Sequence, residues 1–267
     1  MKHILIAAAA ILPAWSAASA QEAPAPDTSA SSGYRVRLGA GAQLRPKFPG
    51  AGRDEISPLF HVNVARGNEL FKFSAPDDST GIAIVSSNGF AIGPTVNLAS
   101  GRKDKDVGGL PLGRVKTTIE VGGFADYWMG NTVRLRGELR KGLNGHNGLI
   151  GQIGADRVWR NGDKYLFSIG PRLMFSDSTY QRAFFGVKPA VALATGLPVY
   201  RPDGGISGVA LATGFNYQFN DQIGMFDYAR FERLVGDAAK SPIVRQLGSR
   251  NQVSVGLGLS YTFAVRR

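Results

Sequence analysis

The chain has 267 residues, a net charge of +11 and no cysteine, so disulfides are excluded and stability must come from packing and hydrogen-bonded closure. Glycine is abundant at 35 residues, which weakens helices and fits strands in close register. The basic balance would suit nucleic acid, an anion-attracting lumen or anionic envelope polymers, and the secretory signal described next argues against the first.

The first 33 residues predict a targeting signal and a leader. Lys2, the apolar run 4–12 and the small residues 18–20 are typical of a secretory signal over residues 1–20. That run is too short for a membrane helix, and the mature chain has no run of about 18 apolar residues. Residues 21–33 are rich in Ala, Pro and Ser and are expected to be flexible, which leaves residues 34–267 for the folded part.

Beyond the leader, many segments alternate apolar residues with small or polar ones, as strands with one buried and one lipid- or solvent-facing side do. In chain order they are residues 34–45, 56–65, 70–74, 81–87, 90–100, 115–129, 132–143, 148–159, 164–176, 207–219, 223–234 and 251–263. The last has six apolar residues of one parity, ending in Tyr261 and Phe263. A tilted strand spans a bilayer with roughly 9–11 residues, and aromatics suit its interface.

Loop lengths alternate between short and long along most of the chain. The short turns are residues 67–68, 88–89, 130–131, 160–163 and 220–221, and the long loops include residues 101–114, 177–205 and 235–250. Bacterial barrels have short periplasmic turns and long outer loops, whereas a soluble β-sandwich has no reason for this alternation. With no barrel strand in residues 177–205 the count is twelve, and with two it is fourteen. We predict an all-β, transmembrane antiparallel β-barrel of about 12 strands (10–14).

Basic side chains recur on the polar faces of these strands. Four ionised groups lie in line on residues 132–143 and cannot enter a dry core without a heavy desolvation cost, so in a barrel they would line the lumen. The lumen could favour anions, or it could be plugged, with the arginines paired to Glu120, Glu138 and Asp156. The candidate basic face comprises Arg35, Arg37, Lys116, Arg134, Arg136, Arg140 and Arg172.

The sequence predicts no catalytic, metal or cofactor site. The mature chain has two histidines, His61 and His146, and no nucleophile elbow, P-loop or dinucleotide fingerprint. His61 shares a polar face with Ser57 and Asn63, which would suit a hydrolase, but these are ordinary lumen residues and we interpret His61 as a solvated lumen side chain. His146 lies in a Gly/Asn loop and is expected to serve the turn.

Two stretches resemble the MipA/OmpV family of outer-membrane proteins. Residues 234–244, L-V-G-D-A-A-K-S-P-I-V, are close to the family's gDAadSPiv stretch, with Lys240 where an acidic residue is more usual. Residues 185–187 and 195–200 are similar to its yFGV…SGLPxY pattern, with Thr195 in place of Ser. The matching loop positions are Gly186, Gly196, Leu197, Pro198, Tyr200, Asp237, Ala238, Ser241 and Pro242.

The resemblance implies a Gram-negative outer-membrane β-barrel in contact with membrane lipid and not with nucleic acid. The family's namesake is thought to be a scaffold between a murein-cleaving transglycosylase and a murein synthase, and other members are described as porin-like. We therefore expect an envelope scaffold linked to periplasmic murein enzymes, and the alternative is a passive channel for small anionic solutes. Residues 237–242 are expected to fold over the mouth or into the lumen.

Overall fold

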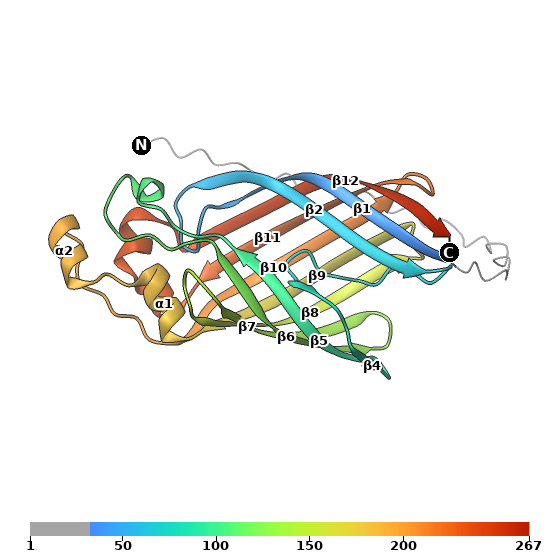
Figure 1. Ribbon diagram of the computed structural model, residues 1–267, viewed down its shortest axis with the longest axis horizontal. Helices are drawn as coiled ribbons and strands as arrows, with labels where there is room; N and C mark the ends of the chain where they lie inside the picture. The colour runs from blue at the N-terminus through green and yellow to red at the C-terminus, as the bar shows by residue number, and fades with distance from the viewer. Residues whose placement is uncertain (1–32, 267) are drawn as a thin grey trace, which may run out of the picture. The chain divides into compact units, whose positions relative to one another are not determined.

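The computed structural model describes residues 33–266, so the predicted signal and the leader up to residue 32 lie outside the described residues. Within this range an antiparallel sheet of 12 strands curls into a barrel wall (Figure 1). The prediction of an all-β barrel of about twelve strands is confirmed. Across residues 33–266, no helix is long and apolar enough to cross a membrane.

Ten long strands form the wall, and each pairs antiparallel with the next one along the chain, except that β2 does not pair with β5. The first and last strands also pair, with Tyr34 opposite Val265. The ten are β1 (Gly33–Pro46), β2 (Asp54–Arg66), β5 (Phe90–Ala99), β6 (Thr118–Met129), β7 (Val133–Gly142), β8 (Leu149–Asn161), β9 (Tyr165–Ser176), β10 (Gly205–Gln218), β11 (Ile223–Leu234) and β12 (Asn251–Arg266).

The alternation of each strand separates an outer apolar face from an inner small or polar face. On β12, Leu259 is 63% exposed, whereas the next residue, Ser260, is 5% exposed. Gly256 and Gly258 lie on the inner face, where an added Cβ would fall within 2.4 Å of the Tyr228 or Phe226 ring. The small residues of this strand therefore make room for aromatic side chains from β11.

The segment after β2 differs from the sequence prediction. Residues 70–74 are not a strand, and residues 81–87 are broken into β3 (Thr80–Gly81) and β4 (Val85–Ser87), both paired with β5. Five residues are too few to span a bilayer as a strand. Instead, residues 70–79, which we call the lumen segment, run along the inner side of the wall, with Phe71, Ala75 and Ser79 buried.

The hydrogen-bonded ladder has one break. Among the described strands, the order runs from β2 through β1 and β12 round to β5 and β3, and β2 has no ladder to β3, β4 or β5. The lumen segment lies along the inner side of this break, where Asn63 Nδ2 donates to the carbonyl of Lys72 at 2.8 Å. The barrel therefore has a seam between β2 on one side and β3 to β5 on the other.

The short turns lie at one end of the barrel, where Gly33 at the start of β1 pairs with Arg266 at the end of β12, and the long loops lie at the other end (Figure 1). Residues 177–204 contain two helices and no barrel strand, because Asp177 caps the first helix through Tyr180 N at 2.8 Å and Pro189 begins the second. The long-loop helices are η1 (Asp104–Val107), α1 (Ser178–Phe185), α2 (Pro189–Thr195), α3 (Gly236–Lys240) and the π-helical turn η2 (Ile243–Leu247).

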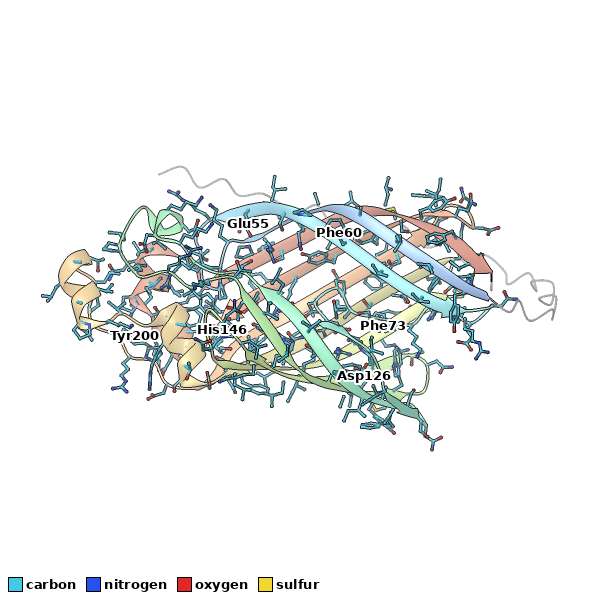
Figure 2. All side chains as sticks on the ribbon, in the orientation of Figure 1. Glu55, Phe60, Phe73, Asp126, His146 and Tyr200 are labelled. Atoms are coloured by element: carbon cyan, nitrogen blue, oxygen red, sulfur yellow. The ribbon has the colours of Figure 1, made fainter. Side chains whose placement is uncertain are left out.

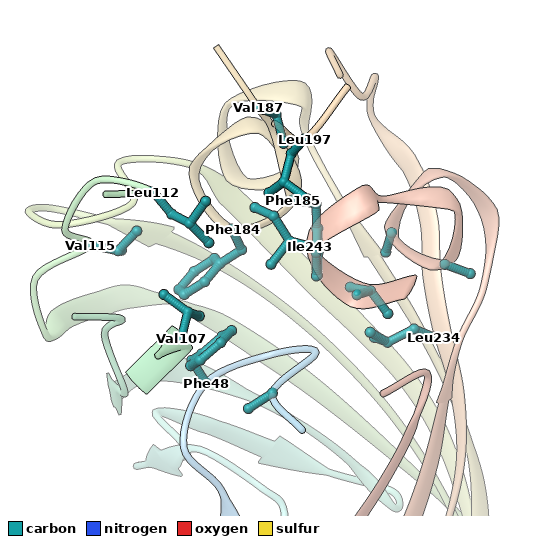
Figure 3. Close-up of a cluster of buried hydrophobic side chains, with 14 of the residues drawn as sticks. Phe48, Val107, Leu112, Val115, Phe184, Phe185, Val187, Leu197, Leu234 and Ile243 are labelled. Atoms are coloured by element: carbon teal, nitrogen blue, oxygen red, sulfur yellow. The ribbon is translucent and has the colours of Figure 1, made fainter. Parts of the chain in front are cut away.

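The long loops pack on one another around the main cluster of buried apolar side chains (Figure 3). A barrel whose lumen is polar has no apolar core between its walls, so this cluster sits at the mouth instead. We call it the loop cap. Its buried members are Phe48, Ala51, Val107, Leu112, Val115, Tyr180, Phe184, Phe185, Val187, Leu197, Leu234, Ala238, Ala239, Ile243 and Val244.

Candidate functional site: a filled lumen and a loop cap

Three consecutive residues fix the lumen segment to the wall. Asp77 accepts two hydrogen bonds from Arg172 on β9, both at 2.9 Å, and Asp78 accepts two from Arg134 on β7, at 2.7 and 3.0 Å. Ser79 donates from its backbone N and its Oγ to Glu138, at 3.2 and 2.8 Å. Paired carboxylate and guanidinium groups fix orientation as well as position, so these contacts hold the segment in one place.

Asp156 on β8 joins the two anchoring arginines. Its Oδ2 accepts from Arg134 Nη2 at 2.8 Å, and its Oδ1 accepts from Arg172 Nη2 at 2.7 Å. Because all three side chains are at most 3% exposed, their charges must balance locally.

The ion pairs continue from the lumen segment to the loop cap. Arg136 lies 3.5 Å from Asp78 and 2.6 Å from Glu138, and Glu138 also pairs with Arg140. Arg140 Nε donates to Glu120 at 2.9 Å, and Glu120 contacts His146 Nε2 at 3.0 Å. One continuous network therefore links the segment inside the barrel to a histidine at its mouth.

Where four arginines of the candidate basic face line the lumen, their positive charge is balanced by carboxylates. Arg134, Arg136, Arg140 and Arg172 each have a carboxylate within 3.0 Å. Arg230 on β11 joins them, at 2.9 Å from Glu232. The network holds these five guanidinium groups and seven carboxylates, namely Asp77, Asp78, Glu120, Asp126, Asp156, Glu138 and Glu232.

Aromatic side chains of the lumen segment contact other cations of the predicted face. Arg35 and Arg37 lie over the Phe71 ring at 4.8 and 4.1 Å, near the short-turn end. Phe73, labelled in Figure 2, lies under Arg134 at 4.6 Å. These contacts are cation–π interactions, and the two phenylalanine rings occupy space beside the arginines.

Lys116 is the one residue of the predicted basic face that does not belong with the rest. It lies in the loop before β6, is exposed, and lines a separate cavity at the long-loop end. The expectation placed it on a strand that begins at residue 115, whereas β6 begins at Thr118.

Sequence reasoning missed Asp77, Asp78 and Arg230. The two aspartates lie between the predicted strand segments 70–74 and 81–87, and Arg230 lies on the predicted segment 223–234 but was not included in the basic face. A signal was present, since residues 70–74 are about half the length that a bilayer-spanning strand needs. A short alternating segment followed by two acidic residues, facing strands rich in arginine, is a pattern that could have predicted a lumen segment.

The two family-like stretches meet in the loop cap. Ser241 Oγ donates to the carbonyl of Phe185 at 2.7 Å and is fully buried, and Tyr200 OH donates to the carbonyl of Asp237 at 2.9 Å. Ala238 and Leu197 pack in the same cluster. Gly196 ends α2 in the left-handed region with φ of 73°, where glycine has no Cβ penalty. The shared motifs therefore place one long loop against another.

Asp237 itself is half-exposed at the rim of the cap. Its carboxylate accepts from Asp203 N at 3.1 Å and from Lys240 Nζ at 3.1 Å. The hydrogen bond from Asp203 N, followed by that from Lys240, lowers the pKa of Asp237 below the usual range for aspartate. The carboxylate thereby fixes the chain between α2 and β10 to helix α3.

A buried arginine, Arg102, fixes a third loop to the cap. Its guanidinium donates to Phe184 O at 2.5 Å and Ala183 O at 3.3 Å, the last carbonyls of α1, and to Leu112 O at 3.2 Å. Burial lowers the pKa of Arg102 to about 10, so it stays charged at neutral pH. A cation at a helix C-terminus is favourable, and this one joins the β5–β6 loop to α1.

His146 connects the cap to the lumen. Its Nδ1 accepts from Gly148 N at 3.0 Å, which leaves Nε2 to donate to Glu120. Its ring packs edge-on against Tyr180 of α1, with ring centroids 4.9 Å apart. The histidine closes its turn, as the sequence predicted, and also joins the ion network.

His61 faces the lumen beside Phe226, with ring centroids 5.4 Å apart. Ser57 is four residues away along extended β2, or about 13 Å, which is too far for a nucleophile–base hydrogen bond. In residues 33–266, no three or more His, Cys, Asp or Glu side chains gather to hold a metal ion. The charged side chains of this interior form ion pairs with one another.

The fold and interior define a class of protein, a membrane-type antiparallel β-barrel with an ion-paired lumen and a packed loop cap. The chain belongs to the MipA family, whose model is described as "MltA-interacting protein MipA" and matches residues 38–263. The predicted family resemblance is confirmed. No curated protein is detectably similar to the chain in sequence.

Several solved structures are similar to the chain at low identity. An outer membrane channel from Pseudomonas putida F1 has 8% identity and a TM-score of 0.44, covering 90% of this chain and 100% of its own. The translocator domain of the autotransporter NalP from Neisseria meningitidis has 12% identity and a TM-score of 0.42, covering 88% and 90%. The outer membrane protein OprG from Pseudomonas aeruginosa has 11% identity and a TM-score of 0.26, covering 87% and 97%.

Proposed function

We propose that this chain is an outer-membrane barrel with a closed lumen that acts as a scaffold for a murein-processing enzyme. The observation that carries the proposal is the fixation of the lumen segment by Asp77, Asp78 and Ser79 to three wall side chains. A barrel filled in this way is suited to present surfaces and not to pass solutes.

The outer face supports a place in the outer membrane. Exposed aromatic side chains ring the short-turn end, and they include Tyr127, Trp159, Phe219, Tyr261 and Phe263. Tyr261 stacks with Phe263, and Trp159 with Phe167, at centroid distances of 6.3 and 5.6 Å. Aromatic girdles of this kind mark the membrane–water interface of outer-membrane barrels. The short-turn end would then face the periplasm, where murein enzymes act.

The kind of partner follows from the family to which the chain belongs. Its family is described by interaction with MltA, a murein enzyme, and this chain shares the motifs that build the loop cap. The membership supports a murein enzyme as the partner class and leaves its contact surface to experiment.

The test combines conductance with capture. Refolded full-length protein in a planar bilayer is expected to be silent while migrating as a folded, heat-modifiable band. The same protein, immobilised in detergent, is expected to retain a purified MltA-type transglycosylase that an unrelated refolded barrel does not retain. Stable conductance from the wild-type protein, or equal retention by both barrels, would overturn the scaffold proposal.

One observation favours a second function, a porin-like channel that opens on a signal. Ion pairs, and not an apolar core, fix residues 77–79 to the wall, so water and salt could compete for the same groups. If high ionic strength converts the silent barrel into one with stable, ohmic openings, the channel function is supported over the scaffold.

A further inference from the structure

A cavity of about 380 Å³ lies at the long-loop end of the seam. It is bounded by the β1–β2 hairpin on one side of the seam and by the β5–β6 loop on the other, so it bridges the break in the wall. Its basic lining residues are Arg45, Lys47, Lys103, Lys105, Arg114 and Lys116.

The charge around this cavity is unbalanced. Its two carboxylates are already engaged, because Glu55 lies 3.3 Å from Arg45 and Asp106 lies 3.5 Å from Lys47. Among the described residues, the other four cations have no carboxylate within 4.0 Å, and those four are Lys103, Lys105, Arg114 and Lys116. The contrast with the lumen is sharp, since each arginine of the lumen network has a carboxylate partner.

The surroundings of the cavity distinguish a lipid from a free anion. Leu98 lines it and is 65% exposed, and Ile56, beside Glu55 at the start of β2, is 79% exposed. Phe60, 76% exposed, continues the same outer face toward the short-turn end (Figure 2). A basic cavity at the top of an exposed apolar strip suits a headgroup with its acyl chains below it.

We propose that this cavity binds the headgroup of a lipid that carries two phosphate groups. Four unpaired cations match two phosphates, each of which carries about −1.5 to −2 charges near neutral pH. The headgroup would connect the two sides of the seam through the β1–β2 hairpin and the β5–β6 loop. The proposal rests on the outer-membrane location proposed above and is independent of the scaffold role.

The test is binding of bisphosphorylated lipid A and of its dephosphorylated form to the refolded full chain in uncharged detergent. The bisphosphorylated form is expected to bind at least about tenfold more tightly, and its affinity is expected to fall with added salt. The triple variant Lys105→Gln, Arg114→Gln, Lys116→Gln is expected to lose about tenfold, corresponding to about 1.4 kcal/mol.

A matched control removes the same charge from the same end of the barrel. Lys188, Arg201 and Arg250 are exposed and lie outside the cavity lining, so their triple glutamine variant is expected to bind within about twofold of wild type. Heat-modifiable migration checks folding of both variants, and the single variants Lys105→Gln and Arg114→Gln replace the triple variant if it does not fold.

Three outcomes would overturn the proposal. They are equal binding of the phosphorylated and dephosphorylated lipids, equal losses in the cavity and control variants, and binding of inorganic pyrophosphate as tight as that of the lipid. The last would assign the cavity to a free anion. None depends on a murein enzyme, so failure here is distinguishable from failure of the scaffold proposal.

Discussion

The carboxylate of Asp78 accepts two hydrogen bonds from the guanidinium of Arg134, at 2.7 and 3.0 Å, inside a barrel whose wall contains only one of these residues. Asp78 belongs to the lumen segment, and Arg134 belongs to β7, 56 residues later in the chain. Together with the pair formed by Asp77 and Arg172, this ion pair holds the lumen segment inside the barrel.

Removing the two anchoring charges should release the lumen segment. The variant Asp77→Asn, Asp78→Asn leaves Arg134 and Arg172 with fewer anionic partners in a buried site, which typically destabilises by about 3–5 kcal/mol. We expect a lower urea midpoint for unfolding of the heat-modifiable band and the appearance of single-channel openings in planar bilayers.

The control for the released lumen is Asp221→Asn, which removes one charge from an exposed turn between β10 and β11. It should remain silent and as stable as wild type. If the double variant is equally silent and equally stable, residues 77 and 78 do not hold the segment in place.

The network predicts that the lumen segment and the loop cap are coupled. Asp78 reaches His146 through Arg136, Glu138, Arg140 and Glu120. In a double-mutant cycle, Asp78→Asn and His146→Ala should show a coupling energy of about 0.5 kcal/mol or more, because residues of one hydrogen-bonded network are not additive. Additive losses in urea unfolding would show that the two ends are energetically independent.

The loop cap should depend on the shape of Arg102 and not only on its charge. Lysine keeps the charge but cannot reach the carbonyls of Phe184 and Leu112 together. We expect Arg102→Lys to cost about 2–3 kcal/mol of cap stability and to expose residues 101–117 and 177–204 to protease while the barrel still migrates as folded. Arg201→Lys, in the same loop region but exposed, should digest like wild type.

Ser241→Ala tests whether the family-like stretch is structural. The serine is fully buried, and its loss leaves the Phe185 carbonyl without this donor, a cost of about 1–3 kcal/mol. We expect faster cleavage within the cap, whereas the exposed Ser87→Ala should have no effect. A Ser241→Ala protein with a wild-type digestion pattern that no longer retains a murein enzyme would instead assign the residue to an interface.

The contact between Asp237 and Asp203 N should weaken in acid. The pKa of Asp237 is lowered in the folded protein, so its stabilising contribution is present above the unfolded aspartate pKa of about 3.9 and is lost as pH falls below that value. Protection of the Asp203 amide from exchange, taken relative to an unstructured peptide at the same pH, should therefore fall between about pH 4 and pH 2.5. In Asp237→Asn this protection should be low at both pH values, and a fall of the wild-type size in that variant would contradict the assignment.

The amino-acid sequence alone determined the wall of this barrel. The period-2 alternation of segments such as residues 251–263, together with turns such as Asn161-Gly162, fixes which side chains face outward, and both are local properties of the chain. The family motifs identified the two loops that meet in the cap. The alternation does not predict what the inner face of β7 contacts, because a row of arginines on that face is compatible with an open lumen and with a filled one.

Tertiary structure decided how the lumen is filled and where the wall is broken. Asp77 and Asp78 pair with Arg172 and Arg134 across separations of 95 and 56 residues, and no local pattern specifies such contacts. The same holds for the cavity beside the seam, whose basic residues come from two hairpins far apart in the chain. Local periodicity sets the direction of each side chain. Only the assembled arrangement of strands and lumen segment sets which charges share a low-dielectric interior and must therefore neutralise one another.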